Sequence, residues 1–361
     1  MIIQMKHDVN GEEIEKALSR LGELADEASI NIEYRVVHGE DLPVIAVKGS
    51  ASDMAHISKD RLEQLAGVDK VKPIADSYKL ASRNYLDSTR IIRNNGIEVG
   101  NGRLCVIAGP CAVESEEQIV RAALDASDAG ADMLRGGAYK PRTSPYSFQG
   151  HREEGLKMLQ KAKREVGLPI VTEITDARTI DLFLEHDVDV FQVGARNCQN
   201  YDLLNALSEG LKGTGKAVLY KRGPATSLDE FIQGAEYMLS GDVQNVMLCL
   251  RGIKGTDNKH TRNSVDTGDV SVLSQRCNLP IVYDPSHSAG RRELVYSTAL
   301  GAIGHGAHGL IVEAHPDPEN AQSDGAQSLY SHYGPESKEG LKRLIDDGRR
   351  FYDMRRQIDE V

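Results

Sequence analysis

The feature that most restricts the fold is a unit that repeats from residue 104 towards the end of the chain. Each unit has a short apolar run, then polar or glycine residues, then an amphipathic stretch with helical spacing. Strands that alternate with helices form parallel sheets, and eight units in roughly 250 residues suit a closed (β/α)8 TIM barrel. A doubly wound open sheet, the alternative α/β fold, usually has fewer parallel strands. The apolar runs cover residues 104–109, 131–135, 169–173, 190–194, 217–221, 245–250, 280–284 and 309–313.

Helical spacing of apolar residues predicts the helices of this barrel. We expect them over residues 117–129, 155–166, 228–239 and 291–300, with a final helix near 338–355. The barrel then occupies residues 103–361 of the chain.

The first 75 residues predict a separate, small α/β domain. Strand-like runs lie at 2–7, 32–37, 44–47 and 68–73, and two helical patterns lie between them. The first pattern follows the potential cap Asn10, and its apolar residues are Ile14, Ala17, Leu18, Leu21 and Leu24. The apolar residues of the second are Met54, Ile57, Leu62 and Leu65. The order βαββαβ is that of a ferredoxin-like fold. It contains no catalytic constellation, so a regulatory ligand-binding role and a packing or oligomerisation role both remain open.

Residues 76–102 are interpreted as a linker. The strand-like Gly96 to Val99 and the turn Gly100 to Gly102 predict a small hairpin at its end. Residues 38–43 are predicted to form the turn between two strands of the small domain.

The charge balance excludes general binding to polyanions. Lys and Arg total 43 against 54 Asp and Glu, a net charge of −11. Such a chain repels nucleic acid and anionic membranes. The five cysteines are irregularly spaced and indicate no disulfide framework. We find neither a leader segment nor an apolar run of roughly 20 residues. A cytoplasmic protein is therefore expected.

The predicted strands end in chemically unusual residues, and in a closed barrel all these ends meet at one rim. One group is cationic and would suit two phosphate groups and a carboxylate. Its loop from 132 to 150 adds the hydroxyls of Thr143 and Ser144, and Pro141 and Pro145 restrict its backbone. The cationic group consists of Arg135, Lys140, Arg142, Arg196, Lys221, Arg222 and Arg251.

The second group at the rim offers metal ligands. Cys111, His287, Glu313 and Asp324 follow strands one, seven and eight, which are adjacent in a closed barrel. Each alone is compatible with an ordinary buried or surface residue. Together they suit one divalent cation of borderline softness, Mn²⁺, Fe²⁺, Co²⁺ or Zn²⁺.

Several long motifs resemble the 3-deoxy-D-arabino-heptulosonate 7-phosphate (DAHP) synthase family. They are GPCAVES (109–115), LRGGAYKPRTSPYSFQG (134–150), GARNCQN (194–200), DPSHSAGRR (284–292) and HPDPENAQSDGAQSL (315–329). They are most similar to the branch with a ferredoxin-like front domain and a barrel like that of 3-deoxy-octulosonate 8-phosphate synthase. The resemblance runs from about residue 101 to the end of the chain.

The resemblance implies an enzyme that condenses phosphoenolpyruvate with erythrose 4-phosphate and water and releases phosphate, the first step towards the aromatic amino acids. The family's metal ligands fall on Cys111, His287, Glu313 and Asp324. Its phosphoenolpyruvate contacts fall on Arg135, Lys140, Arg196, Lys221 and Arg251, and its aldose phosphate loop on Arg142, Thr143 and Ser144.

Three further roles are hypotheses about the chemistry. Lys140 is the candidate general acid, and either Glu173 or water bound to the metal is the candidate base for the water proton; by the resemblance, Asp284 is an acidic group near the reacting atoms. The resemblance also implies a homo-oligomer, with a tetramer favoured, and an aromatic amino acid effector bound by the front domain.

The chain departs from the family pattern at Leu250, where many members of the branch carry Glu, and in the segment 255–262, which bears on the second substrate. An octulosonate 8-phosphate synthase using arabinose 5-phosphate is the nearest competing interpretation. Its loop usually has Ala-Asn after the lysine, whereas Pro141 follows Lys140 here. A non-catalytic regulatory barrel would be expected to lack some of these ligands or cations, and a metal-dependent pyruvate aldolase would not need so many cations.

Overall fold

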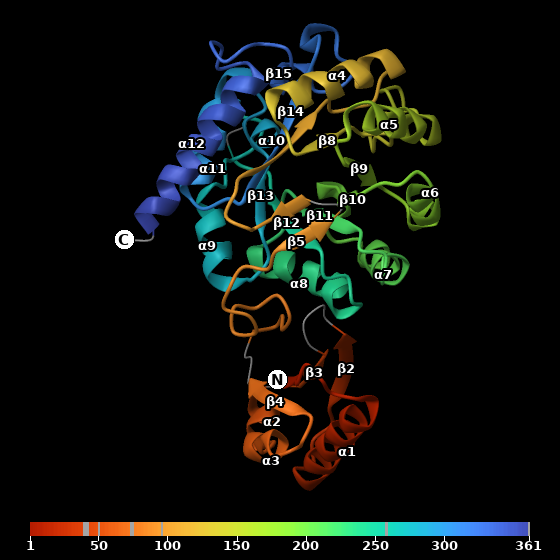
Figure 1. Ribbon diagram of the computed structural model, residues 1–361, viewed down its shortest axis with the longest axis vertical. Helices are drawn as coiled ribbons and strands as arrows, with labels where there is room; N and C mark the ends of the chain where they lie inside the picture. The colour runs from red at the N-terminus through yellow and green to blue at the C-terminus, as the bar shows by residue number, and fades with distance from the viewer. Residues whose placement is uncertain (39–42, 50, 73–75, 95–96, 257–258, 360–361) are drawn as a thin grey trace.

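The computed structural model describes residues 1–38, 43–49, 51–72, 76–94, 97–256 and 259–359. A small domain from the start of the chain lies at one end of the molecule, and a much larger barrel makes up the rest (Figure 1). Among the described residues, no helix is both long and apolar enough to cross a membrane.

The small domain is a four-stranded antiparallel sheet with helices on one side. Its strand order is β2-β3-β1-β4, and the element order confirms the predicted βαββαβ arrangement. The turn expected at 38–43 falls mostly on residues 39–42, outside the described residues. The elements are β1 (Ile2–Met5), α1 (Gly11–Glu27), β2 (Glu33–His38), β3 (Pro43–Lys48), α2 (Ala51–His56), α3 (Lys59–Glu63) and β4 (Val68–Lys72).

The start of α1 follows the local sequence signal. The Asn10 side chain accepts a hydrogen bond from the Glu13 backbone N–H at 3.0 Å, and the Glu13 carboxylate accepts one from the Asn10 N–H at 3.1 Å. This capping box satisfies two backbone donors that the helix leaves unpaired. The second helical pattern was expected to be one helix but forms two, because Ser58 has extended backbone angles (φ −67°, ψ 106°) between α2 and α3.

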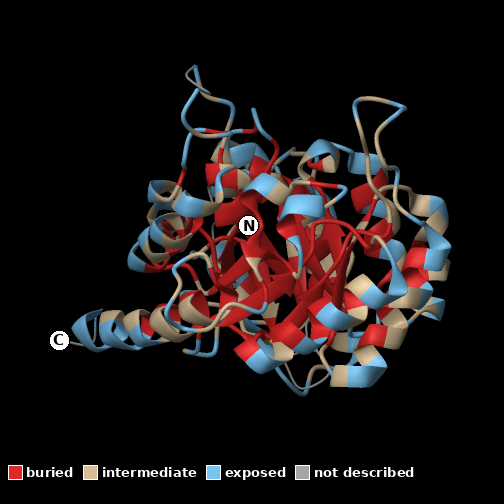
Figure 2. Ribbon diagram, turned by 90° about the horizontal axis from the view of Figure 1, so that it is seen from above, coloured by how far each residue is buried: buried red, intermediate tan, exposed pale blue. Residues whose placement is uncertain are grey.

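The large domain is the predicted eight-stranded parallel barrel. Each strand pairs with its neighbours in chain order, and β14 closes the barrel on β7, with Gly309 opposite Cys105. Figure 2 shows the buried strands inside a ring of helices whose outer faces are exposed. The barrel strands are β7 (Cys105–Gly109), β8 (Met133–Arg135), β9 (Ile170–Ile174), β10 (Val190–Val193), β11 (Ala217–Lys221), β12 (Val246–Leu250), β13 (Ile281–Tyr283) and β14 (Gly309–His315).

The surrounding helices confirm the expected positions to within a few residues. Most bury one apolar face against the strands, such as Leu156, Leu159 and Ala162 of α5. They are α4 (Glu116–Ala129), α5 (Glu153–Val166), α6 (Ile180–Glu185), α7 (Tyr201–Gly210), α8 (Leu228–Ser240), α9 (Gly268–Arg276), α10 (Pro285–Ala289), α11 (Arg292–Gly304) and α12 (Leu341–Asp359). Short turns add η1 (Ala177–Thr179), η2 (Ala195–Asn197), η3 (Pro318–Asn320), η4 (Gly325–Gln327) and the strand β15 (Leu329–Tyr330).

A hairpin closes the amino-terminal end of the barrel. It consists of β5 (Ile92–Asn94) and β6 (Ile97–Val99), so a hairpin lies at the end of the linker as predicted, but the expected turn at 100–102 was wrong because β6 pairs with the residues that precede it. Ile92 and Val99 pack in the same apolar cluster as the inward-facing residues of the barrel. The hairpin therefore covers the barrel interior at this end.

The two domains meet through a few polar contacts and some apolar packing. Arg35 on β2 donates to the Ser240 carbonyl at 3.2 Å and to its hydroxyl at 2.9 Å. The linker is fixed to the barrel in turn, because the backbone N–H groups of residues 79–81 donate to the Glu236 carboxylate on α8. We propose the division into 1–75, 76–102 and 103–361; residues 73–75, at its first boundary, lie outside the described part.

Candidate active site at the carboxyl end of the barrel

A cavity of about 120 Å³ opens at the carboxyl ends of the barrel strands. Its lining is strongly cationic and includes side chains from seven different strand ends or the loops that follow them. It is lined by Arg135, Lys140, Pro141, Arg142, Glu173, Gln192, Gly194, Ala195, Arg196, Lys221, Arg251, Arg262, His287 and Asp324. Six of the seven cations predicted for the rim thus face one cavity.

Three of these cations are buried in the barrel. Arg135 lies 3.2 Å from Glu313 through its Nη1, and Lys221 forms a short ion pair with Asp284. Arg251 is 8% exposed and makes no ion pair or hydrogen bond within the described part of the chain. Burying an unpaired charge is costly, so this guanidinium points to an anionic ligand.

Arg222 does not belong to this cluster, and its inclusion in the sequence analysis was wrong. Its guanidinium bonds Asp266 at 3.2 Å and Asp269 at 2.6 Å, away from the cavity. The reason is the alternation of side chains along a strand, which directs successive residues to opposite sides. Lys221 points into the barrel, and the next residue points out.

The loop after β8 places its polar groups along the edge of the cavity. Arg142 donates to the Ser323 hydroxyl at 3.0 Å, and Arg196 donates to the Pro141 carbonyl and, at 3.3 Å, to Thr143. Thr143 and Ser144 do not line the cavity itself. The Ser144 hydroxyl accepts a hydrogen bond from the Tyr146 backbone at 3.3 Å.

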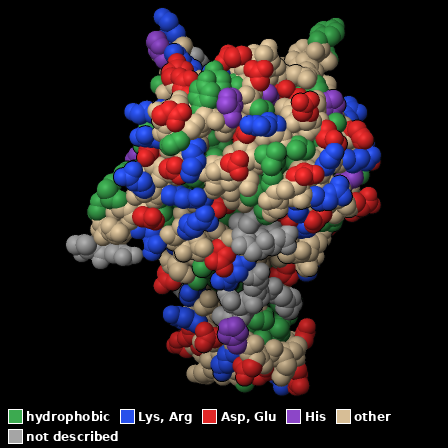
Figure 3. All heavy atoms as spheres, turned by 45° about the horizontal axis from the view of Figure 1, so that its top comes forward, with side chains coloured by type: hydrophobic (Ala, Val, Ile, Leu, Met, Phe, Trp, Pro, Cys, Tyr) green, Lys and Arg blue, Asp and Glu red, His purple; other side chains and the backbone are tan. Residues whose placement is uncertain are grey.

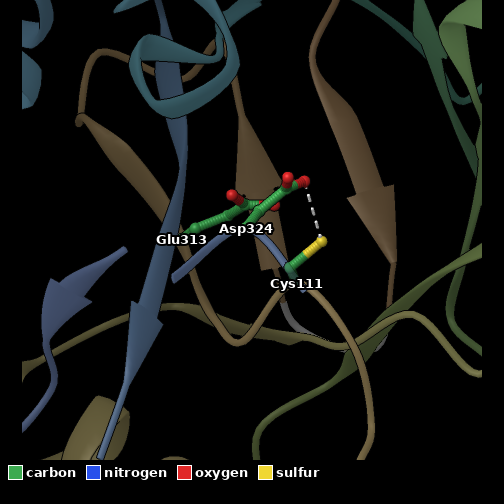
Figure 4. Close-up of side chains that lie close together, drawn as sticks. All are labelled: Cys111, Glu313 and Asp324. Atoms are coloured by element: carbon green, nitrogen blue, oxygen red, sulfur yellow. Dashed lines mark hydrogen bonds between the residues drawn. The ribbon is translucent and has the colours of Figure 1, made fainter. Parts of the chain in front are cut away.

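The four predicted metal ligands converge beside this cavity. One ligand atom from each of Cys111, Glu313 and Asp324 lies within 4.8 Å of the others, and the Cys111 sulfur is 3.3 Å from Asp324 Oδ2 (Figure 4). His287 Nε2 lies 3.5 Å from Glu313 Oε1 and 3.7 Å from Asp324 Oδ2. Cys111 is far from the other three in the chain, and the closure of the barrel between β7 and β14 brings it to them.

The other nitrogen of His287 is held by a carboxylate. His287 Nδ1 lies 2.8 Å from Asp284 Oδ2, and the other oxygen of Asp284 accepts the backbone N–H of His287 at 2.9 Å as the cap of α10. A histidine that ligates a metal usually has such a partner, which fixes its tautomer and its orientation. His287 Nε2 therefore faces Glu313 and Asp324.

The donor set fits a divalent cation. Glu313 is fully buried, and its Oε1 makes no hydrogen bond within the described residues, since Arg135 lies at ion-pair distance without the alignment of a hydrogen bond. Its Oε2 accepts from the Gln327 amide at 2.5 Å. A buried carboxylate oxygen without a donor, facing a thiol and an imidazole, is what a bound cation would satisfy.

The protonation states agree with ligation. Burial lowers the pKa of His287 despite the nearby Asp284, so its imidazole is neutral at pH 7. Burial alone would raise the pKa of Asp324, but Arg262 and His287 lower it to about 2. Burial raises the pKa of the Cys111 thiol to about 12, and a metal would have to displace its proton on binding.

The two candidate proton-transfer groups both line the cavity, Lys140 from the loop after β8 and Glu173 from the neighbouring strand β9. Lys140 Nζ is 3.0 Å from both the sulfur and the carbonyl oxygen of Cys111. Burial alone would lower the pKa of Lys140, but Cys111 and Glu173 raise it, so the ammonium keeps its proton at pH 7. The Glu173 carboxylate packs directly on Gly194. A residue with a Cβ at position 194 would displace this carboxylate.

Four polar residues of the site were not predicted from the sequence: Gln192, which lines the cavity, and Arg262, Ser323 and Gln327. Arg262 pairs with Asp324 Oδ1 at 3.1 Å, Ser323 lies 3.2 Å from the Cys111 sulfur, and Gln327 bonds both Glu313 and Arg262. Ser323 and Gln327 flank Asp324 within one motif, so their spacing was an available signal. Arg262 had no such signal beyond the unusual segment 255–262, of which residues 257–258 lie outside the described part.

Comparisons with known proteins agree with this geometry. The model of the DAHP synthetase I family matches residues 87–344. Phospho-2-dehydro-3-deoxyheptonate aldolase of Thermotoga maritima is 40% identical over 346 residues, covering 96% of this chain and 98% of the relative. A 2-dehydro-3-deoxyphosphooctonate aldolase of Acidithiobacillus ferrooxidans is 32% identical over 238 residues, covering 61% of this chain and 82% of the relative.

A solved structure of the Thermotoga maritima phospho-2-dehydro-3-deoxyheptonate aldolase (DAHP synthase) superposes with a TM-score of 0.72 at 37% identity. It covers 98% of this chain, and 97% of the solved chain is matched, so the similarity includes the small front domain. The family match, the barrel and the shared domain order lead to one conclusion: the chain belongs to the DAHP synthetase I family.

Proposed function

We propose that this chain condenses phosphoenolpyruvate with erythrose 4-phosphate and water, producing 3-deoxy-D-arabino-heptulosonate 7-phosphate and inorganic phosphate. The observation that carries the proposal is the position of Cys111, His287, Glu313 and Asp324 against a cavity lined by seven cationic side chains. The two substrates bring two phosphate groups and one carboxylate, which match this excess of positive charge.

The four side chains would hold one Mn²⁺, Fe²⁺, Co²⁺ or Zn²⁺ ion. Such an ion, when bound, supplies Lewis acidity at the aldehyde oxygen of the sugar. The chain itself orients the ligand set, because Asp284 holds His287 and Gln327 holds Glu313. In this proposal Asp284 is a positioning group, since Lys221, the His287 ring and the His287 N–H occupy its two oxygens.

We assign the anionic groups of the substrates to the cavity and to the loop at its edge. Phosphoenolpyruvate would lie against five of the lining cations, and the aldose phosphate against three polar residues of the loop after β8. Fixing both substrates in register converts a bimolecular encounter into a local one, which is worth several kcal/mol of the barrier. The five cations are Arg135, Lys140, Arg196, Lys221 and Arg251, and the loop residues are Arg142, Thr143 and Ser144.

Proton transfers fall to Lys140 and Glu173. As C3 of phosphoenolpyruvate bonds to the aldehyde carbon, the new alkoxide needs a proton, and Lys140 is charged and faces the cavity. Water then bonds to C2 and gives one proton to Glu173; as the C2–O bond to phosphate breaks, the second proton of that water leaves with the phosphate and C2 becomes the ketone carbon. Glu173 lines the same cavity from β9, the strand next to β8, whose loop carries Lys140.

Arabinose 5-phosphate is the second candidate acceptor, because the octonate aldolase relatives share the barrel. The coverage favours the four-carbon sugar, since the heptonate aldolase matches nearly the whole chain, including the front domain. The two acceptors differ by one carbon, so the loop around Pro141 has to discriminate their lengths.

Phosphate release tests the proposal directly. Purified protein with Mn²⁺ and phosphoenolpyruvate should release phosphate with erythrose 4-phosphate and far more slowly with arabinose 5-phosphate. Removing the metal with a chelator should abolish release, and Mn²⁺ should restore it. Full activity in the chelator would remove the metal from the proposal, and equal rates with both sugars would remove the assigned specificity.

We also propose that the front domain responds to an aromatic amino acid and that the chain forms a homo-oligomer, a tetramer in the first instance. Phosphate release with each aromatic amino acid, and light scattering of the protein with and without it, would test both statements. An unchanged rate with all of them would exclude this kind of regulation.

A further inference from the structure

The loop that carries Asp324 has an unfavourable backbone conformation at that residue. Asp324 has φ 56°, in the left-handed region, and directly precedes the short turn η4 without a side-chain capping hydrogen bond. A residue other than glycine pays roughly 1 kcal/mol or more for this conformation, so surrounding contacts have to maintain it. Its side chain nevertheless lies 3.3 Å from the Cys111 sulfur.

Arg292, the first residue of α11, bonds both ends of this turn. Its Nη2 donates to the Gly325 carbonyl at 3.2 Å, and its Nε donates to the Ser328 carbonyl at 2.7 Å. The two carbonyls bracket η4, and the first belongs to the residue directly after Asp324. A planar guanidinium can make both bonds at once, whereas an ammonium cannot span them.

The same guanidinium is itself held in place. Its Nη1 donates to Glu319 at 2.9 Å and to the Tyr330 hydroxyl at 2.8 Å, and its Cζ lies 4.3 Å from the centre of the Tyr330 ring. The Tyr330 hydroxyl also donates to Glu319 at 2.7 Å. These contacts join the start of the loop, at η3, to its end, at β15.

Helix preference does not explain an arginine at this position. The first turn of a helix is its positive end, where a cation is electrostatically unfavourable. The Arg292 side chain is also only 13% exposed. The neighbouring Arg291 has an ordinary surface role: it is 52% exposed and pairs with Glu293.

From these contacts we infer that Arg292 is a positioning residue for the metal ligand Asp324, acting through the turn Gly325–Gln327. The inference rests on the proposed function, because it assigns Asp324 to the metal. It goes further in stating that the affinity for the metal depends on a residue that touches neither metal nor substrate.

Cobalt binding to the full-length, metal-free protein tests the inference. Coordination by the Cys111 thiolate gives a charge-transfer absorption in the near ultraviolet, which is a readout independent of turnover. We expect Arg292→Lys and Arg292→Gln to weaken Co²⁺ binding at least about tenfold, the usual effect of losing an outer-sphere partner. Arg291→Ala, the matched control, should bind as the wild type does. Activity of Arg292→Lys should recover partly as Mn²⁺ is raised.

The outcomes separate the inference from the proposed function. Wild-type Co²⁺ affinity in folded Arg292→Lys, with or without a lower melting temperature, would show a purely structural role and overturn the inference. Absence of the band in the wild type would instead overturn the metal assignment. If Arg292→Gln does not fold, Arg292→Lys and Tyr330→Phe decide, since Tyr330→Phe removes one bond to the guanidinium and keeps the ring.

Discussion

At the scale of single residues, Lys140 is assigned the most specific chemical role in the proposed function. Its ammonium lies 3.0 Å from the Cys111 sulfur and lines the cavity, and its pKa is raised despite burial. A proton donor in this position acts on the transition state, so its loss should affect turnover rather than substrate binding alone.

We predict that Lys140→Met lowers kcat by about 100-fold or more, the usual range for a lost general acid. Steady-state phosphate release at saturating substrates measures this. Lys161→Met is the control. Lys161 lies on α5 at the surface, where it pairs with Glu116 of α4, so this substitution should leave kcat unchanged. Near-normal kcat with only a raised KM would contradict the proton-donor role.

His308 should make the stability of the barrel depend on pH. Its Nδ1 accepts a hydrogen bond from the Ile281 N–H at 3.1 Å, and burial and two arginines lower its pKa from 6.5 to about 4. The unfolded chain then binds a proton between pH 6.5 and 4 that the folded protein does not, so stability is full above pH 6.5 and is lost as the pH falls.

Between pH 7 and pH 4 the free energy of unfolding should fall by about 2 kcal/mol. This is less than the pKa shift of His308 alone would give, because the imidazole ring is partly accessible to solvent. Urea unfolding at a series of pH values measures it, and His308→Asn should flatten this part of the curve. A wild-type curve that stays level from pH 7 to 4.5 would contradict the prediction.

At the scale of elements, the outer side of the strand ends is held by a buried polar cluster. Asp266 accepts hydrogen bonds from the Gly252 N–H at 2.8 Å and the Tyr283 hydroxyl at 3.0 Å, and it pairs with Arg222 at 3.2 Å. The cluster joins the ends of β11, β12 and β13, from which Lys221, Arg251 and Asp284 project. Its role is to hold these ends in register.

Asp266→Ala should lower the free energy of unfolding by roughly 2 kcal/mol, because the buried Gly252 N–H loses its acceptor and Arg222 keeps only Asp269 as an ion-pair partner. Asp229→Ala removes an exposed ion pair with Arg276 and should change stability by less than about 1 kcal/mol. Urea denaturation of both variants measures the difference. Equal effects would mean that the buried cluster adds no stability beyond a surface pair.

At the scale of the whole molecule, the candidate site is built entirely from the barrel. All residues that line the cavity lie between Arg135 and Asp324, and the hairpin at β5 and β6 closes the opposite end. Over the face in Figure 3, acidic and basic side chains are intermixed, so the concentration of cations inside the cavity is a local feature of an acidic protein.

A chain that begins at residue 76 should therefore fold and keep most of its activity, while losing any response to amino acids. The linker must stay, because Tyr78, Leu80 and Ala81 pack in the core of the barrel. Circular dichroism and phosphate release test this. A folded but inactive truncation would show that the front domain contributes to catalysis.

The sequence by itself determined the order and type of the elements. Apolar periodicity and caps such as Asn10 are local properties, and they located the eight strands and the main helices to within a few residues. The closure of the barrel also placed strands one, seven and eight side by side, so the convergence of Cys111 with His287 and Glu313 followed from strand order.

Only the tertiary structure decided which charges face the cavity. Lys221 and Arg222 are neighbours in the chain, yet one lines the site and the other is neutralised outside it. Arg262 and Arg292 reach the loop of Asp324 from distant segments. The physical reason is that these roles depend on contacts between residues far apart in the sequence, whereas periodicity and capping depend only on near neighbours.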